Sequence, residues 1–389
     1  MAKFAQGKYQ IKNPDKYVGG RTPLYRSSWE FAFMKFCDES PSIQKWANES
    51  IRIPYKHPMT GKYTIYVPDF FIAYTDKNGR PHAEHIALKN KINFKGANMY
   101  VTLEPCSHYG KTPPCTNSII KSGINEVFYS INDIDEKVKG KSFKILSKRN
   151  IKVKKNLLKN ESKNLYDSYI FNRKNKTPYV TAKIAISKNK LIYSEGTKRI
   201  TDNASDKLSH YLRFKNDAIM VSSKTLNMDD PKLNCRLEGY ENFSPKRIIL
   251  DKDLKIKLNT YIFKTSNKNN TIIFHNSLDN FKIKTLKKKG IILVKSKVDY
   301  KKKINLRFVL KKLYSLGIRS LLVEGGDKLT KNMLKNRLIN QFYLFRSPKD
   351  LPMNKKYINF TSDNILNYMY KIRSKISSKL AKDTITIYK

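Results

Sequence analysis

One imidazole, one carboxylate and two thiols occur in this chain at a spacing that suits metal chemistry. His82 is followed two residues later by Glu84, and the run PCSHYGKTPPC then supplies Cys106 and Cys115. An imidazole and two thiolates can hold zinc and leave its fourth position open for water. The metal lowers the pKa of that water toward neutrality. A nearby carboxylate that is not a ligand, here Glu84, can then move protons between the water and a leaving amine.

The order of these residues is typical of zinc enzymes that deaminate nucleobases. Their signature is H-x-E followed by P-C-x-x-C; here the gap is wider, with eight residues between Cys106 and Cys115. The alternative interpretation is a chance HAE tripeptide beside two unrelated cysteines. Cys37 and Cys235 stand apart and are typical of small buried hydrophobic residues. Four cysteines in 389 residues do not indicate a disulfide framework.

The run TLEPCSHYGKTPPC, with its wide cysteine spacing, resembles the deaminase half of the bifunctional deaminase–reductase family of riboflavin biosynthesis. The rest of the chain resembles the reductase half, through TPYVTAKIAIS, ITDNASDKLSHYLRFKNDAIMVSSKTLNMDDPKLNCR, RIILD and LLVEGGDKLT, in that order. The resemblance covers residues from about 82 to 389. It implies an α/β fold class: a truncated cytidine-deaminase-like zinc domain followed by a dihydrofolate-reductase-like domain with a mixed, mostly parallel sheet.

This resemblance also implies two reactions and two cofactors, Zn²⁺ and NADPH. In the first reaction, an exocyclic amine is removed from a diaminopyrimidinone ribosylamino 5′-phosphate, with Glu84 as the catalytic acid and base. The zinc ligands are then His82, Cys106 and Cys115. In the second reaction, NADPH reduces 5-amino-6-(5-phosphoribosylamino)uracil to the ribityl product. The expected partners are therefore phosphorylated pyrimidine substrates, and a homodimer is possible on the same grounds.

The reductase contacts that the resemblance implies fall on particular residues. Substrate contacts fall on Thr197, Arg213, Leu233, Arg236 and Glu324. Cofactor contacts fall on Ile186, Arg199, Thr225, Asp229, Gly326, Asp327, Lys328 and Leu329. Arginine forks suit a phosphate, and a Gly-Gly turn before a helix lets backbone N–H groups approach one. The family pattern has Trp where Arg199 stands, and its Asp-Gly after the first strand is replaced by SKNK.

Residues 1–80 resemble a different protein, the head-completion protein of tailed phages, a member of the PD-(D/E)xK nuclease group. The matching runs are MAKFAQGKYQIKNPDKYVG, YRSSWEFAFMKFCDES and IRIPYKHPMTGKYTIYVPDFFIAYTDKNG. Such an α+β nuclease holds Mg²⁺ with a helix acid, an aspartate after a strand and a Glu-x-Lys. Glu30, Asp69 and Lys89 fill three of these places, but Ala87 stands where the last acid belongs. We therefore expect no intact nuclease site.

Glu84 lies where the two resemblances meet. The nuclease needs a strand over residues 80–90 and the deaminase needs a helix, and HAEHIALKNK favours a helix. The deaminase family begins with a hairpin and a segment that grips the substrate, and we find no match to that segment here. We therefore expect that two unrelated segments are joined near residue 82 and that the deaminase activity is impaired. Whether the junction is a natural fusion or an assembly join stays open.

The predicted domains follow from these resemblances. They are a nuclease-like segment over 1–80, a zinc deaminase domain without its hairpin over 81–155, a helix and linker over 156–176, and the reductase over 177–389. Helices are predicted through WEFAFMKFCDE after Ser27-Ser28, at HAEHIALKNK and after Pro113-Pro114. Strands are predicted at IRIPY, YTIYVPDFFIAYT, NMYVTLEP, EVFYSI, YVTAKIAI, DAIMVS, RIILD, NTIIFH, GIILV and RSLLVEG.

The formal net charge of +46 admits three interpretations. It can reflect the composition of an AT-rich genome, attraction of phosphorylated substrates, or weak non-specific binding of nucleic acid. The chain contains no apolar run of membrane-spanning length, and the stretch MAKFAQGKYQ is not an apolar leader. A cytoplasmic enzyme is therefore expected. The alternative is a phage head-completion or DNA-processing protein with a passenger C-terminal region.

Overall fold

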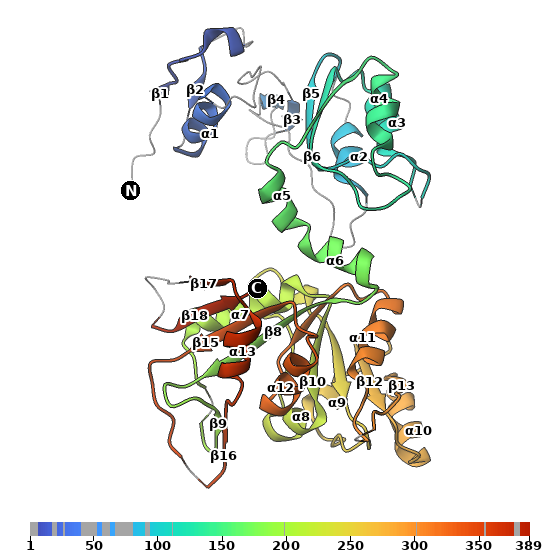
Figure 1. The fold of residues 1–389 in the computed structure, drawn as a ribbon, viewed down its shortest axis with the longest axis vertical. Helices are drawn as coiled ribbons and strands as arrows, with labels where there is room; N and C mark the ends of the chain where they lie inside the picture. The colour runs from blue at the N-terminus through green and yellow to red at the C-terminus, as the bar shows by residue number, and fades with distance from the viewer. Residues whose placement is uncertain are drawn as a thin grey trace. The chain divides into compact units, whose positions relative to one another are not determined.

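In the computed structural model the chain divides into two compact units, Met1–Tyr166 and Asp167–Lys389, and each is described here by itself (Figure 1). The structure describes residues 7–17, 22–25, 28–39, 53–56, 63–66, 81–89, 94–110, 112–197, 199–300, 302–353, 355–376 and 382–389. Asp69 lies outside the described residues, as does the side chain of Glu30. The structure therefore does not place the acidic side chains of the predicted nuclease site.

The front of the first unit contains short elements around a small core. They are β1 (Gly7–Lys8), η1 (Pro14–Lys16), β2 (Leu24–Tyr25), α1 (Ser28–Glu39), β3 (Ile53–Lys56) and β4 (Tyr63–Tyr66). The predicted helix α1 and the antiparallel strands β3 and β4 are all present. Buried Asp38 accepts hydrogen bonds from the backbone N–H groups of Lys12 (2.7 Å) and Asn13 (3.1 Å). This carboxylate ties the loop before η1 to the end of α1.

The rest of the first unit is a three-stranded parallel sheet with helices packed beside it (Figure 1). The strands are β5 (Asn98–Leu103), β6 (Glu126–Ile131) and β7 (Lys152–Lys155), and the helices are α2 (Ala83–Leu88), α3 (Cys115–Lys121) and α4 (Lys141–Ser147). Every residue of the central strand β6 is buried. Val127 from this strand, Ile119 from α3 and Leu146 from α4 meet in one apolar core. Burial of apolar surface therefore fixes the helices that carry the candidate zinc ligands against the sheet.

The helix predicted at HAEHIALKNK is confirmed as α2. Lys89 closes that helix as its C-cap, so it does not lie on the strand that a nuclease site needs. The polar helix predicted near residues 155–172 is in fact two helices, α5 (Lys159–Leu165) and α6 (Asp167–Asn175). The break falls at Tyr166, whose φ of −98° and ψ of 7° depart from helical values. The division between the two units falls at the same place.

The second unit is built on a nine-stranded sheet with the order β13-β12-β11-β10-β14-β8-β15-β18-β17. Neighbours from β13 through β15 are parallel, and β18 and β17 pair antiparallel at one edge. The strands are β8 (Tyr179–Ile186), β10 (Ala218–Ser222), β11 (Lys246–Leu250), β12 (Thr271–His275), β13 (Ile292–Lys295), β14 (Ser320–Val323), β15 (Gln341–Arg346), β17 (Arg373–Ile376) and β18 (Thr384–Tyr388). All six apolar strands predicted for this region are present, in the mixed sheet that was expected.

Helices cover both faces of this sheet, because strands inside a parallel sheet are apolar on both sides. The helices are α7 (Asn203–Lys215), α8 (Ser223–Asp229), α9 (Tyr261–Lys264), α10 (Asn280–Lys288), α11 (Leu306–Ser315), α12 (Asp327–Lys335) and α13 (Asp363–Met369), with a short 3₁₀ turn, η2 (Glu241–Phe243). Val309 of α11 and Met333 of α12 belong to one core, and Leu212 of α7 and Leu286 of α10 to the other. Strands β9 (Leu191–Ser194) and β16 (Tyr357–Asn359) form a separate antiparallel pair.

Parallel strands end at a common edge, and ligands of such sheets bind outside their carboxyl ends. Ile186, Ser222 and Glu324 stand at or just beyond the carboxyl ends of β8, β10 and β14. Two of the implied substrate and cofactor residues, Ile186 and Glu324, thus lie at this edge. None of the helices in the described part of the chain combines the length and hydropathy that crossing a membrane requires.

Candidate functional site

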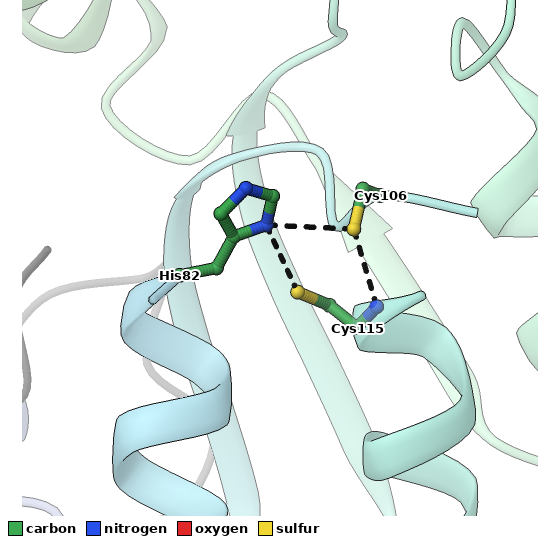
Figure 2. Close-up of side chains that lie close together, drawn as sticks. All are labelled: His82, Cys106 and Cys115. Atoms are coloured by element: carbon green, nitrogen blue, oxygen red, sulfur yellow. Dashed lines mark hydrogen bonds between the residues drawn. The ribbon is translucent and has the colours of Figure 1, made fainter. Parts of the chain in front are cut away.

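His82, Cys106 and Cys115 converge in the first unit as the sequence predicts (Figure 2). The Nδ1 atom of His82 lies 3.3 Å from the Sγ of Cys115 and 3.5 Å from the Sγ of Cys106. The three ligand atoms all lie within 4.8 Å of one another. Zinc bonds of about 2.0–2.3 Å in a tetrahedron separate the ligand atoms by about 3.4–3.8 Å. The cluster therefore fits a zinc ion with very little movement.

Each ligand stands where one element ends and another begins. His82 is the N-cap of α2, with extended backbone angles. Cys106 follows β5 in the loop after Glu104-Pro105, and its Sγ accepts a hydrogen bond from the backbone N–H of Cys115 (3.2 Å). Pro114 is the N-cap of α3, so Cys115 is the first residue of that helix. The proline before Cys115 suits a helix start, because it needs no backbone N–H there.

The pKa values of the two thiols are shifted in opposite directions. The pKa of Cys106 is lowered to about 4, chiefly because the Cys115 thiol donates to it and also because His82 lies beside it. The pKa of Cys115 is raised by the same hydrogen bond and by burial. Without a cation the pair therefore carries one negative charge. A bound metal ion is what allows both sulfurs to be thiolates at once.

Glu84 is not one of the three clustered ligands, yet it lies beside them. Burial raises its pKa, while His82 and His85 oppose that shift. A carboxyl group of this kind, held next to a metal site without binding the metal, is suited to taking up and releasing a proton. The charge of Glu84 acts on Cys115, so this carboxyl group lies close to the cluster.

Further polar groups surround this site that the sequence analysis did not single out. Buried Glu104 accepts hydrogen bonds from the backbone N–H groups of Asp133 (3.2 Å) and Gly140 (3.0 Å) and from the hydroxyl of Ser142 (2.6 Å). It thereby holds the loop after β6. The hydroxyl of Tyr166 lies 2.7 Å from the Oγ1 of Thr102 on β5. Burial raises the pKa of Tyr166, and Glu84 adds to that shift, so this phenol lies near the zinc cluster.

In the second unit, Arg213 and Glu324 form a buried bidentate ion pair. The Nε and Nη2 atoms of Arg213 donate to the two carboxylate oxygens of Glu324 at 2.9 and 2.8 Å. Both side chains are only 13% exposed. Burial works against the charge of Glu324, and Arg213 more than offsets it, so the pKa of Glu324 is lowered. The pair joins α7 to the carboxyl end of β14, where a phosphorylated substrate is expected.

Arg236 lies close to this pair. Arg213 donates to the backbone oxygen of Asn234 (3.2 Å), and Arg236 donates to the side-chain oxygen of the same residue (2.7 Å). The Nδ1 of His210 accepts from the backbone N–H of Arg236 (3.2 Å), and Leu233 is buried with φ of 53°. The predicted substrate residues Arg213, Leu233, Arg236 and Glu324 are therefore brought together. His210 was missed because a lone histidine in a polar helix gives no signal in the sequence.

Lys183 was also missed. It lies on the interior strand β8, with its Nζ 4.9 Å from the centre of the Phe345 ring. Burial lowers the pKa of Lys183, while Glu324 raises it, so the ammonium group shares its surroundings with the Arg213–Glu324 pair. The sequence feature that could have identified Lys183 is its position within the otherwise apolar run YVTAKIAI.

The Gly-Gly turn lies between β14 and α12, as predicted. A Cβ on Gly325 would come within 2.8 Å of Leu329, and one on Gly326 would lie 3.8 Å from the Oγ1 of Thr225. The predicted cofactor residues Thr225, Gly326 and Leu329 are therefore close together. The carboxylate of Asp327 instead accepts from the backbone N–H (2.9 Å) and hydroxyl (2.8 Å) of Thr361. Its side chain fastens the loop before α13 rather than projecting freely from the helix.

The remaining predicted residues are placed less closely. Arg199 is exposed, and its guanidinium pairs with Asp206. Asp229 and Lys328 are exposed, and Thr197 is half-buried in the turn after β9. Ile186 is buried, and its backbone oxygen accepts from the N–H of Ser347 (2.8 Å). Arg199 is linked to the Arg213–Glu324 pair through Asp206, whose charge also acts on Arg213 and Arg236.

Two family models match the chain. The RibD C-terminal domain matches residues 178–385, and the zinc-binding region of cytidine and deoxycytidylate deaminases matches residues 67–131. The riboflavin biosynthesis protein RibD of Aquifex aeolicus is 33% identical over 341 residues, which cover 86% of this chain and 93% of that protein. The RibD of Actinobacillus pleuropneumoniae is 33% identical over 71% of this chain and 73% of its own length.

Solved structures are similar as well. The diaminohydroxyphosphoribosylaminopyrimidine deaminase/5-amino-6-(5-phosphoribosylamino)uracil reductase of Thermotoga maritima is 28% identical, with a TM-score of 0.64 over 80% of this chain and 85% of that one. RibD of Acinetobacter baumannii, at 23% identity and a TM-score of 0.65, shares the fold. Residues 82–389 are 308 of 389 residues, about 79% of the chain, so the 86% covered by the Aquifex relative includes residues before His82. Similarity to this family therefore starts ahead of the junction predicted near residue 82.

Proposed function

Because this chain belongs to the RibD family of riboflavin-biosynthesis enzymes, we propose that it catalyses both reactions of that family. The first unit deaminates a diaminopyrimidinone ribosylamino 5′-phosphate. The second reduces 5-amino-6-(5-phosphoribosylamino)uracil with NADPH. The single observation that carries the first assignment is the His82, Cys106 and Cys115 cluster with Glu84 beside it. The observation that carries the second is the buried Arg213–Glu324 pair at the carboxyl edge of the sheet.

For deamination, His82, Cys106 and Cys115 would hold zinc, with the two cysteines as thiolates. The zinc, when bound, supplies a water of lowered pKa. Glu84 would take a proton from that water as its oxygen bonds to the ring carbon, and would pass a proton to the exocyclic nitrogen, so that the carbon–nitrogen bond breaks and ammonia leaves. Burial raises the pKa of Glu84, which favours its protonated form in the second half of this transfer. The ring carbon that carried the amine ends as a carbonyl.

For reduction, bound NADPH would supply a hydride to C1′ of the ribose. The bond from C1′ to the ring oxygen would break and that oxygen would take up a proton, which leaves an open ribityl chain. Arg213 is held rigidly by Glu324 and Asn234, so its remaining surface and that of Arg236 can bind the substrate phosphate. Lys183 adds a cation beside Glu324 and can contact a substrate oxygen. Leu233 and Thr197 complete the substrate side of this proposal.

We place the NADPH phosphates at the turn formed by Gly326, Asp327, Lys328 and Leu329, beside Thr225. The absence of a Cβ at Gly326 leaves the N-terminal turn of α12 open to an anion. Backbone groups of Ile186 and the side chains of Arg199 and Asp229 are the further cofactor contacts that the family resemblance implies. Arg199 must leave Asp206 to make such a contact.

The domain limits are also a proposal. Because the zinc-region model matches from residue 67, we propose that the deaminase domain begins no later than that residue instead of at 81. The reductase domain begins at 177–178, after the helices α5 and α6. The phage-like origin of the remaining front residues stays a prediction, as do a homodimer, a cytoplasmic location and weak binding of nucleic acid. Mg²⁺-dependent DNA nicking that is lost in Asp69→Ala would contradict the expectation of a broken nuclease site.

One experiment tests the two proposed activities together. Purified full-length protein is given NADPH and either the uracil substrate or its pyrimidinone precursor, and loss of NADPH absorbance is followed. Oxidation of NADPH with the uracil substrate tests the reductase. Oxidation with the precursor requires both reactions in sequence. Failure with the uracil substrate would refute the reductase assignment, and one bound zinc per chain is expected by metal analysis.

A further inference from the structure

We propose that His85 is a positioning residue that clamps the start of α3 and thereby sets where Cys115 meets the metal. This inference rests on the proposed zinc site and adds a residue to which no role has been assigned. The Nε2 of His85 lies 2.9 Å from the backbone oxygen of Pro113, and its Nδ1 lies 3.0 Å from the Oγ of Ser118. One imidazole thus holds the chain on both sides of Cys115.

The two helices place this link one turn below the metal ligands. His85 follows His82 by three residues on α2, and Ser118 follows Cys115 by three residues on α3. Residues three apart on a helix lie on the same face, one above the other. The contact between His82 and Cys115 (3.3 Å) is therefore repeated one turn further on by the contact between His85 and Ser118 (3.0 Å).

The hydrogen-bond partners of the His85 imidazole determine which of its ring nitrogens donates and which accepts. A backbone carbonyl only accepts hydrogen bonds, so the Nε2–H of His85 donates to Pro113. The hydroxyl of Ser118 can then donate to Nδ1 of the neutral ring. Both nitrogens of His85 are used within the protein. This leaves His82 as the imidazole of α2 that faces the sulfurs (Figure 2).

The short helices make such a clamp necessary. Helix α2 has six residues and α3 has seven, and helices of this length are not stable by themselves. Neither His82 nor Pro114 makes a side-chain capping hydrogen bond among the residues that the structure describes. On the far side, Ala87, Leu88 and Ile119 share the apolar core. That core fixes the helices to the sheet from one side, and the hydrogen bonds of His85 hold the start of α3, where buried Cys115 lies.

Groups that orient metal ligands without touching the metal commonly change metal affinity by about 10-fold to 100-fold when they are removed. We therefore expect His85→Leu to lose zinc on the order of tenfold faster than the wild type. Ser118→Ala removes one of the two hydrogen bonds and should accelerate the loss roughly threefold. His85→Gln retains a donor and an acceptor on one side chain and should restore most of the retention.

The experiment measures zinc transfer from full-length protein to an excess of the chromophoric chelator 4-(2-pyridylazo)resorcinol. Wild type, His85→Leu, His85→Gln and Ser118→Ala are compared, with Lys89→Ala as the matched control at the exposed end of α2. Reductase turnover on the same samples reports the folding of the second unit. Deaminase kcat should fall in His85→Leu with KM for the pyrimidine little changed, because ligand placement and not substrate contact is altered.

The outcomes separate this inference from the proposed function. If wild-type protein holds no zinc, the proposed metal site is wrong. If wild type holds zinc and His85→Leu releases it at the wild-type rate, or His85→Gln is as fast as His85→Leu, the clamp is wrong while the site stands. Should His85→Leu fail to fold, Ser118→Ala decides, and a rate equal to that of Lys89→Ala overturns the proposal.

Discussion

The two candidate sites of this chain balance their buried charges in opposite ways. In the first unit, an imidazole and two thiols meet, and the thiols share a proton, because the pKa of Cys106 is lowered and that of Cys115 is raised. In the second unit, Arg213 and Glu324 neutralise each other within the protein. The first site is therefore complete only with its metal, whereas the second is organised before any ligand arrives. This difference predicts that the two activities respond to different perturbations.

The secondary structure that supports the two sites also differs, and it is smaller around the first site. His82 and Cys115 stand at the starts of two short helices, and Cys106 stands in the loop after β5 of a three-stranded sheet. The arginine–carboxylate pair joins a thirteen-residue helix to a nine-stranded sheet with apolar cores on both faces. Metal binding contributes directly to the order of a site of the first kind. We expect the first unit to lose both order and activity when zinc is removed, and the second to be unaffected.

The largest effect is expected from removal of a zinc ligand. Cys106→Ala should abolish stoichiometric zinc and lower deamination by at least about 10³-fold, because loss of the bound water's activation removes the nucleophile. Reduction of the uracil substrate should be unchanged. Metal analysis and the two NADPH-coupled assays measure both effects. Cys37→Ala, a buried cysteine of the same unit, is the matched control, and zinc that survives Cys106→Ala means that the site is misassigned.

Glu324→Gln is expected to have the opposite effect, lowering the reductase activity while the deaminase activity is retained. The change keeps the shape of the side chain but leaves Arg213 buried without its partner, and breaking such a pair costs about 3–5 kcal/mol. We expect roughly 10²-fold lower reductase turnover and a less stable second unit, with zinc content and deamination retained. Turnover and urea unfolding of the full chain measure these effects. A parallel loss of deamination would show that the two sites are coupled.

The intact enzyme should itself be unequal in its two reactions. We expected from the sequence that the segment by which this family grips the deaminase substrate is missing, and lost positioning can cost orders of magnitude in rate. Similarity to the family nevertheless begins ahead of His82. We expect turnover of the pyrimidinone precursor to be at least about tenfold slower than turnover of the uracil substrate. A fragment from about residue 174 onward should retain reductase activity. Equal turnover of both substrates would show that residues before His82 position the pyrimidine.

A smaller effect is expected at Tyr166. Tyr166→Phe removes the hydroxyl that lies 2.7 Å from Thr102, and one hydrogen bond contributes about 0.5–1.5 kcal/mol. Deaminase kcat/KM should therefore fall by roughly 2-fold to 10-fold, while the reductase is unchanged. Steady-state kinetics on both substrates make the measurement. Tyr169→Phe, on the other side of the break between α5 and α6, is the control, and an identical loss there would refute a specific role for Tyr166.

The smallest effect is expected in how the stability of the second unit depends on pH. The pKa of His210 is lowered from 6.5 to about 4, by burial and then by Arg213 and Arg236. The unfolded chain therefore binds a proton between pH 6.5 and 4 that the folded chain does not, so stability is lost as the pH falls through this range. In His210→Gln the free energy of unfolding should fall less steeply there. Urea unfolding at several pH values compares the two slopes, and equal slopes contradict the assignment.

Local patterns were sufficient for much of this protein. The spacing of His82, Cys106 and Cys115 identified a zinc site because ligand types and intervals are constrained by the metal itself. The helix at HAEHIALKNK and the six apolar strands of the second unit followed from periodicity and burial. The break at Tyr166 was missed, because nothing in the polar run around it distinguishes one helix from two.

The sequence by itself determined which residues can bind zinc and which strands build the second sheet, since both depend on residue type and short-range spacing. The tertiary structure decided which charges meet. Lys183 and Glu324 are 141 positions apart, and only the parallel pairing of β8 with β14 brings them together. Arg199 and Asp327 looked free to bind cofactor, but Asp206 and Thr361 hold them. Side-chain partners across a fold depend on long-range packing, which short-range patterns do not encode.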